Sequence, residues 1–307
     1  MVNIAGKRKP VIVRYSMVDK VFYLIINGFL AVSGIIILYP LLYCVACSFS
    51  TTEAIVQGRV FLWPVDFTIR AYTAVISYRL IGTGFLNSLF YVAGGTVVAV
   101  SLILLAAYPL SRKDMKGRKF FLVYFVITMF FSGGIIPNYI LIRDLGLIGS
   151  RLSLILGFMF SCYNMIIVKS YFQSSVPQGI LDAAHIDGCG DVQFFFRFAL
   201  PLAVPVIAVM VLFNAVGIWN GYFSGIMFLT RPETFNFQMV LRNILFVASL
   251  PPEMLAVMDP EHVGAMRNQL QQMRYAVLVV GALPMMILYP FIQRYFIRGM
   301  MIGSLKE

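Results

Sequence analysis

The chain has few charged residues for its length, and this scarcity excludes a soluble globular protein. Charged side chains make up 12% of the 307 residues, whereas soluble domains carry about a quarter. Acidic residues number 13 and histidines two, while hydrophobic residues reach 60%. The mean hydropathy is +0.85. Such a chain cannot cover a water-exposed globule with polar side chains, so we expect a multi-spanning membrane protein.

Several catalytic and metal-binding patterns are also missing. No G-x-x-x-x-G-K-[ST] segment occurs, so the chain has no P-loop to hold ATP phosphates. No H-E-x-x-H occurs, and His185 and His262 lie on opposite sides of a long uncharged run. Cys44 and Cys47 form a C-x-x-C inside another such run, where a thiolate is costly to form. We therefore expect no enzyme activity, metal or cofactor in this chain.

Runs without Asp, Glu, Lys or Arg account for nearly half of the sequence. A helix needs about 20 mostly apolar residues to cross the hydrocarbon core. Six runs are this long or close to it: residues 21–50, 85–110, 120–142, 152–168, 200–230 and 275–292. We predict an all-α polytopic domain of six transmembrane helices over residues 21–297. A segment at 1–20 precedes it, and a tail at 298–307 follows it.

The distribution of Lys and Arg predicts the orientation of these spans. Of the 24 basic residues, 15 fall in segments that share the side of the N-terminus. Cytoplasmic segments carry the excess of Lys and Arg, so both termini are expected to be cytoplasmic, in a plasma membrane. The net charge of +11 is then explained by topology and anionic lipid, and it requires no nucleic-acid partner.

The segment at 174–205, between the fourth and fifth runs, carries the strongest local signal. Ser174 or Ser175 can cap a short helix that has Pro177 in its first turn, and Gly188 can end it. Helical spacing places four residues on one narrow face: Ile180, Ala183, Ala184 and Asp187. The two alanines would permit close approach by another surface.

A second short helix is predicted to begin near Asp191 and to stop before Pro201. Four phenylalanines crowd it, a large aromatic load for a loop outside the membrane: Phe194, Phe195, Phe196 and Phe198. Two such helices suit a groove on another protein. An amphipathic element lying on the bilayer fits their composition equally well.

The residues of this segment resemble those of a known family. DAAHIDG at 182–188, followed by FFRFALPLAVP at 195–205, resembles the EAA loop of ATP-binding-cassette (ABC) importer permeases. Asp182 stands where Glu is usual, and Cys189 where Ala is usual. Residues 131–156, 213–223 and 295–307 are similar to carbohydrate permeases of the maltose-permease type, within them the subgroup for complex oligosaccharides.

The resemblance implies a maltose-permease-like type I importer domain in a bacterial plasma membrane. Its coupling helix would be formed by Asp182, Ala183, Ala184, Ile186, Asp187 and Gly188. This helix would dock on an ABC ATPase dimer, which would hold ATP and Mg. The further partners implied are a second homologous permease, in a heterodimer, an extracytoplasmic solute-binding protein and an oligosaccharide substrate. The C-terminal tail would also touch the ATPase.

Sugars bind to aromatic faces and to amide or hydroxyl groups, and uncharged spans offer few of these. The candidates for the substrate pathway are Asn87, Asn138, Asn214, Trp219, Asn220 and Tyr222. Each of them fits hydrogen bonding between helices equally well. The long outer segment at 231–274 is either a docking surface for a binding protein or a lid packed on its own chain. The alternative function is a self-contained channel or facilitator for a neutral solute, in which the loop at 182–188 has no purpose.

Overall fold

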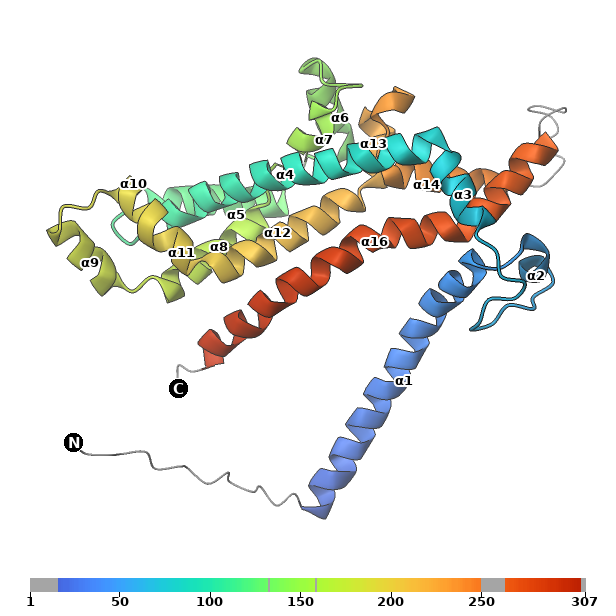
Figure 1. Ribbon diagram of the computed structural model, residues 1–307. Helices are drawn as coiled ribbons and strands as arrows, with labels where there is room; N and C mark the ends of the chain where they lie inside the picture. Colours follow the sequence, from blue (N-terminus) through green and yellow to red (C-terminus); the bar gives the residue numbers. More distant parts are fainter. Residues whose placement is uncertain (1–15, 132, 158, 250–262, 305–307) are drawn as a thin grey trace. The chain divides into compact units, whose positions relative to one another are not determined.

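The computed structural model describes residues 16–131, 133–157, 159–249 and 263–304. Every regular element in these ranges is a helix (Figure 1), which confirms the all-α class. The chain divides into two compact units, residues 1–68 and 69–307. The first unit contains α1 (Met17–Ser48) and α2 (Thr52–Val56).

Helix α1 exposes apolar side chains along most of its 32 residues. Its first turn is capped by Asp19, whose carboxylate accepts a hydrogen bond of 2.9 Å from the Ser16 N–H. Its buried residues lie at the other end, at Ala46, Cys47 and Ser48. A helix of this length spans about 48 Å, and its apolar surface matches a surrounding of lipid or another apolar helix.

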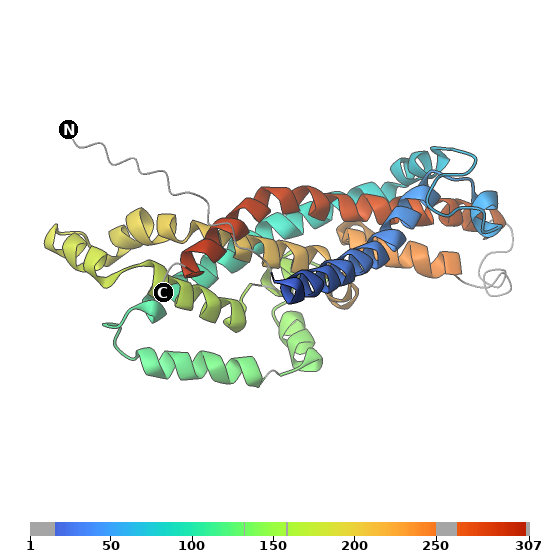
Figure 2. The same ribbon diagram turned by 90° about the horizontal axis from the view of Figure 1, so that it is seen from below.

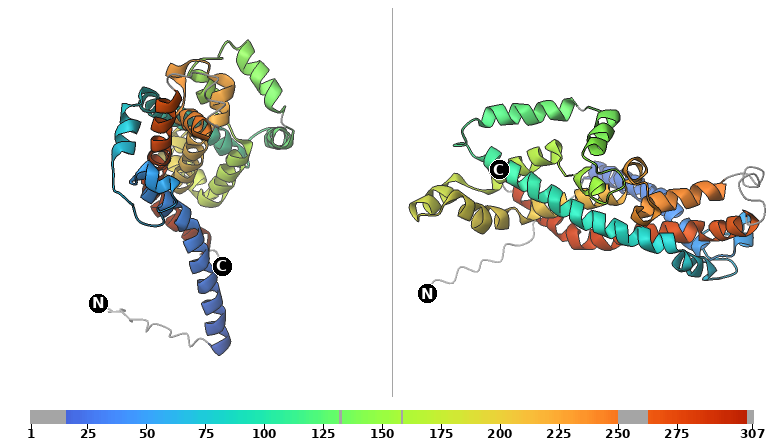
Figure 3. Two further views of the ribbon diagram at one scale, coloured as in Figure 1. Left: turned by 90° about the vertical axis from the view of Figure 1, so that its right-hand side faces the viewer. Right: turned by 90° about the horizontal axis from the view of Figure 1, so that it is seen from above.

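Four long or central helices form the core of the second unit: α4, α8, α12 and α16. Its elements, in chain order, are α3 (Arg70–Ser77), α4 (Arg79–Ser111), α5 (Arg118–Phe130), α6 (Ile135–Asp144), α7 (Leu152–Gly157), α8 (Cys162–Ser175), α9 (Gln178–Ile186), α10 (Asp191–Phe194), a π-helical turn η1 (Phe195–Ala199), α11 (Leu200–Leu202), α12 (Val204–Trp219), α13 (Tyr222–Phe228), a 3₁₀ turn η2 (Pro232–Thr234), α14 (Phe237–Ser249) and α16 (Val263–Ser304). Helix α4 packs against α8 and α12, and α16 packs against α12, α14 and α3. Helices α5 and α6 lie along one side of this group (Figures 2 and 3).

The predicted bounds of three spans are wrong, because the runs are interrupted. The run at 120–142 forms α5 and α6, and the run at 152–168 forms α7 and α8. The run at 200–230 forms α11, α12 and α13, and the chain bends by 78° between Leu202 and Val204. The charge-free pattern cannot reveal such breaks, because a Gly or Pro that interrupts the helical hydrogen bonds leaves the composition apolar.

Three described helices are long and apolar enough to cross a bilayer alone: α1, α4 and residues 273–291 of α16. Two bent pairs meet the same criteria when each is taken together, α5 with α6 and residues 191–202 with α12. The expected division between the domain and its tail at 297–298 lies inside α16, which continues to Ser304.

The first part of the outer segment at 231–274 packs on its own chain. The Asn87 amide donates to the carbonyl oxygens of Glu233 at 2.7 Å and Phe235 at 3.0 Å. The Ser88 hydroxyl accepts from the N–H of Phe237 at 2.8 Å. Residues 250–262 lie outside the described residues, so the docking hypothesis for that part stays a prediction.

The packing between α12, α14 and α16 is centred on Trp219, which is 1% exposed. Its indole N–H donates to the Gly281 carbonyl at 3.0 Å. The ring stacks on Phe237, with centroids 5.8 Å apart, and meets the ring of Phe85 edge-on. A Cβ at Gly281 would lie 2.6 Å from the Phe237 ring, so the glycine permits this close approach.

Replacing Trp219 by Ala should lower the free energy of unfolding by about 3–5 kcal/mol, because it leaves a large cavity. Replacing it by Phe keeps most of the ring and loses one hydrogen bond, so we expect a loss of about 1 kcal/mol plus a smaller packing term. Thermal melting of both variants in one detergent, followed by size-exclusion chromatography, measures the difference. Equal melting temperatures for W219A and the natural chain would contradict this central role.

Candidate functional site

Helix α9 is the centre of the candidate site, and both of its ends are defined by the sequence. It begins at Gln178, after an extended Pro177. Ser175 is the last residue of α8, so the prediction that Ser174 or Ser175 caps α9 is wrong. Gly188 ends the helix as predicted, with φ of +76°. The N–H of Gly188 donates to the His185 carbonyl, and the N–H of Cys189 donates to the Ala184 carbonyl. These are the two hydrogen bonds of a Schellman motif.

The two faces of α9 have different surroundings. Leu181 and Ala184 are buried in a cluster that contains Phe172 and Phe194. The opposite face is exposed, with Ile186 the most open at 87%. The other predicted coupling residues are exposed as well: Asp182, Ala183, Asp187 and Gly188. The prediction of one outward face with both alanines is therefore wrong for Ala184, which packs against its own chain at 7% exposure.

The prediction that the helix after α9 stops before Pro201 is wrong. This helix continues through η1 to Leu202. A proline ring inside an α-helix clashes with the carbonyl four residues earlier. Residue 197, whose carbonyl the ring of Pro201 would meet, lies in the wider π turn over residues 195–199, which relieves this crowding. Phe194 and Phe195 point into the core, whereas Val192 and Phe196 are exposed. The aromatic load thus divides between the core and the surface.

Arg112, at the end of α4, joins the loop to the core. Its guanidinium donates to Asp114 at 2.6 and 2.9 Å, to the Tyr108 hydroxyl at 3.2 Å and to Asp191 at 3.1 Å. The Asp191 carboxylate also lies 3.4 Å from Nε2 of His185 on α9. The Arg112 side chain is only 12% exposed. One guanidinium therefore connects α4 to the first residue of α10 and, through Asp191, to α9.

The charges of this cluster stabilise each other. The hydrogen bonds from Arg112 hold the pKa of Asp114 below its ordinary value. The same hydrogen bonds, which Asp114 accepts, together with the one accepted by the Tyr108 hydroxyl, raise the pKa of Arg112. Arg112 and Asp114 are thus both charged at every physiological pH.

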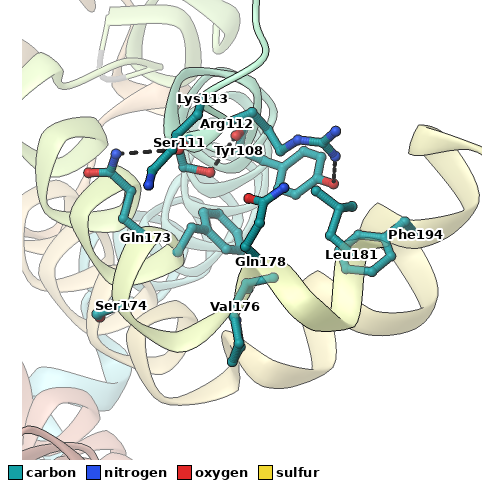
Figure 4. Close-up of a pocket in the computed structure, with 12 residues that line it drawn as sticks. Tyr108, Ser111, Arg112, Lys113, Gln173, Ser174, Val176, Gln178, Leu181 and Phe194 are labelled. Carbon is teal, nitrogen blue, oxygen red and sulfur yellow. Dashed lines mark hydrogen bonds between the residues drawn. The ribbon is translucent and has the colours of Figure 1, made fainter. Parts of the chain in front are cut away.

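A cavity of about 250 Å³ lies between the end of α4 and the base of α9 (Figure 4). The amide of Gln173 on its wall donates to the Ser111 carbonyl at 3.3 Å. Leu181 and Phe172 form part of its apolar side. Among the described residues no group of three or more His, Cys, Asp and Glu is placed to hold a metal ion. The arrangement is that of a support for α9, which holds the helix at one end of the unit with its exposed face outward.

The six residues predicted for the substrate pathway differ in their surroundings. Asn87 and Trp219 are buried, and both donate to backbone carbonyls of other elements. The Asn214 amide donates to the Met210 carbonyl of its own helix. Exposed positions are occupied by Asn138, Asn220 and Tyr222. Asn87 and Trp219 therefore have the contacts of packing residues. The pathway role of the six residues stays a prediction.

Comparison with known proteins gives a family match. The family of binding-protein-dependent transport system inner membrane components matches residues 99–302. The polygalacturonan/rhamnogalacturonan transport system permease protein of Bacillus subtilis is 37% identical over 94% of this chain and 100% of its own length. Protein LplC of the same organism is 37% identical over 91% of this chain and 92% of its own. A chain in the crystal structure of a bacterial ABC transporter involved in the import of the acidic polysaccharide alginate superposes with a TM-score of 0.82. It is 32% identical and covers 92% of this chain and 99% of its own.

Replacing Arg112 by Met keeps a long apolar stem and removes every donor to Asp114, Tyr108 and Asp191. We expect amide hydrogen exchange over residues 178–194 to become roughly fivefold faster, for a loss of about 1 kcal/mol in a partly exposed charge cluster. Arg143→Met is the matched control, because Arg143 pairs with Asp144 at 2.9 Å and both side chains are well exposed. Unchanged exchange in R112M would show that Arg112 does not hold the loop.

Proposed function

The chain belongs to the family of binding-protein-dependent transport system inner membrane components, and from this membership we propose that it carries an oligosaccharide across the membrane as a permease of an ABC importer. Its relatives include a polygalacturonan/rhamnogalacturonan permease and a chain of the alginate importer. Their similarity extends over more than nine tenths of the chain. The sugar therefore crosses by alternating access, in which the helices open toward one side of the membrane at a time.

The outward face of α9 is proposed to dock on an ATPase subunit that holds ATP and Mg. The observation that carries this proposal is the 87% exposure of Ile186 on a helix whose other face is fixed in the core. Ile186 and the exposed Ala183 lie between the carboxylates of Asp182 and Asp187, so this face has an apolar centre with a charged rim, the arrangement found at protein interfaces. Arg112 and the Schellman turn hold the helix in place, so that a displacement of α9 also moves α4.

The remaining partners follow from the same proposal. A second, homologous permease would cover apolar surface that this chain leaves open, such as Leu86 and Phe90 on α4 and Phe120 and Tyr124 on α5. A solute-binding protein would deliver the sugar at the outer face, and both termini would be cytoplasmic. A self-contained facilitator is the rival function, and it gives the exposed face of α9 no purpose.

Ala183→Arg should abolish ATP-driven uptake of the transported sugar, because it adds a long charged side chain to the docking face without breaking the helix. Disruption at the centre of an interface costs about 2 kcal/mol or more, which is roughly thirtyfold weaker docking. The control is Ile76→Arg on α3, at the other end of the unit, where Ile76 is 82% exposed (Figure 3). Both variants should reach the membrane in equal amounts. Normal uptake by A183R would contradict coupling through α9.

A further inference from the structure

We propose that a groove beside α14 is a subsite for a carboxylate-bearing sugar, in which Arg242 binds the carboxylate of a uronate residue. The inference rests on the proposed function, and it specifies the chemical class of the oligosaccharide. The groove has a volume of about 430 Å³ and is lined by Tyr222, Gln238, Leu241, Arg242, Leu245 and Phe246. Pockets of this size are common for small ligands.

The periodicity of α14 places these side chains on one strip of the helix. Phe237, Val240 and Ile244 face the core and are buried. Gln238, Arg242 and Phe246 follow each other at intervals of four residues, so they lie on a common face that is not buried. Helix α13, which packs against α14, contributes the exposed Tyr222. The groove therefore combines one amide, one guanidinium and two aromatic rings.

This set of groups matches the parts of a uronic acid. The guanidinium carbon of Arg242 lies 5.9 Å from the centre of the Phe246 ring, a stacking that orients its planar donors. Among the described residues no carboxylate lies within ion-pair distance of Arg242, so its charge is open to a ligand. A guanidinium binds a carboxylate through two parallel hydrogen bonds. Tyr222 supplies a sugar-stacking face, and Gln238 can bond a hydroxyl group.

The comparisons also favour an acidic sugar over a neutral one. The relatives include transporters of polygalacturonan and of the acidic polysaccharide alginate. A second cavity, of about 610 Å³, is lined by Arg79 and Arg151 but also by the acidic Glu233.

The test uses the complete importer, purified with its partner subunits and solute-binding protein and reconstituted in liposomes. The probes are trigalacturonate and its methyl ester, in which each carboxylate loses its charge and gains one methyl group. The measured quantity is the ratio of their uptake rates at low concentration. Because one binding protein delivers both sugars to every variant, its own preference cancels when ratios are compared.

We expect Arg242→Gln to lower the acid-to-ester ratio about tenfold, the effect of losing one charged, bidentate hydrogen bond. Arg274→Gln is the matched control, because Arg274 also stacks on an aromatic ring, that of Tyr275, and does not line the groove. Gln238→Glu should act in the same direction as R242Q, since a carboxylate one turn before Arg242 competes for its charge. This second variant decides the matter if R242Q does not assemble.

Three results would overturn the subsite, and they separate it from the proposed function. An unchanged ratio in R242Q and Q238E would remove Arg242 from carboxylate recognition. Uptake of an uncharged oligosaccharide such as maltotriose, with no uptake of trigalacturonate, would reject the acidic class and leave the importer function intact. Failure to take up any oligosaccharide would reject the proposed function as well.

Discussion

Close packing along α4 is the constraint on which the rest of the second unit depends. Small residues allow neighbouring helices to approach its backbone, and a Cβ added at Gly95 would lie 2.7 Å from Ile218 of α12. Ala99 and Ala107 are fully buried on the same helix. In lipid, helix association relies on such contacts, because apolar side chains gain little by leaving hydrocarbon. The small residues of α4 therefore determine where α8, α12 and α14 lie.

The same helix links two ends of the unit that have different chemistry. Near its start, Asn87 and Tyr91 hold the chain around η2 through hydrogen bonds to backbone carbonyls. At its end, Arg112 holds Asp191 and, through it, the base of α9. A helix of 33 residues is about 50 Å long and moves as one stiff element. A displacement of α9 can therefore be transmitted through α4 to the region of η2 and α14, where the uronate groove lies.

The sequence predicts the class of fold and the C-terminal end of α9 well. It predicts poorly which side chains contact each other. Charge-free runs identify the membrane class because hydrocarbon excludes charge. Glycine at position 188 predicts the end of α9 because glycine readily adopts a positive φ, here +76°. The burial of Ala184 is not predictable, since small residues fit either face of a helix. The Arg112–Asp191 bond joins residues 79 positions apart, and no local pattern encodes it. Arg242 is not among the predicted sugar-binding residues, because these are chosen from the uncharged runs.

The central claim is that the exposed face of α9 contacts an ATPase, and cysteine cross-linking tests it most directly. Ile186→Cys, in a chain that also carries Cys189→Ser, places one thiol at the most exposed position of α9. A short thiol cross-linker applied to native membranes should join this chain to a P-loop ATPase, which mass spectrometry of the product identifies. The account predicts that adduct from I186C and none from I76C. A thiol at residue 186 that reacts freely with a water-soluble maleimide and gives no ATPase adduct would contradict it.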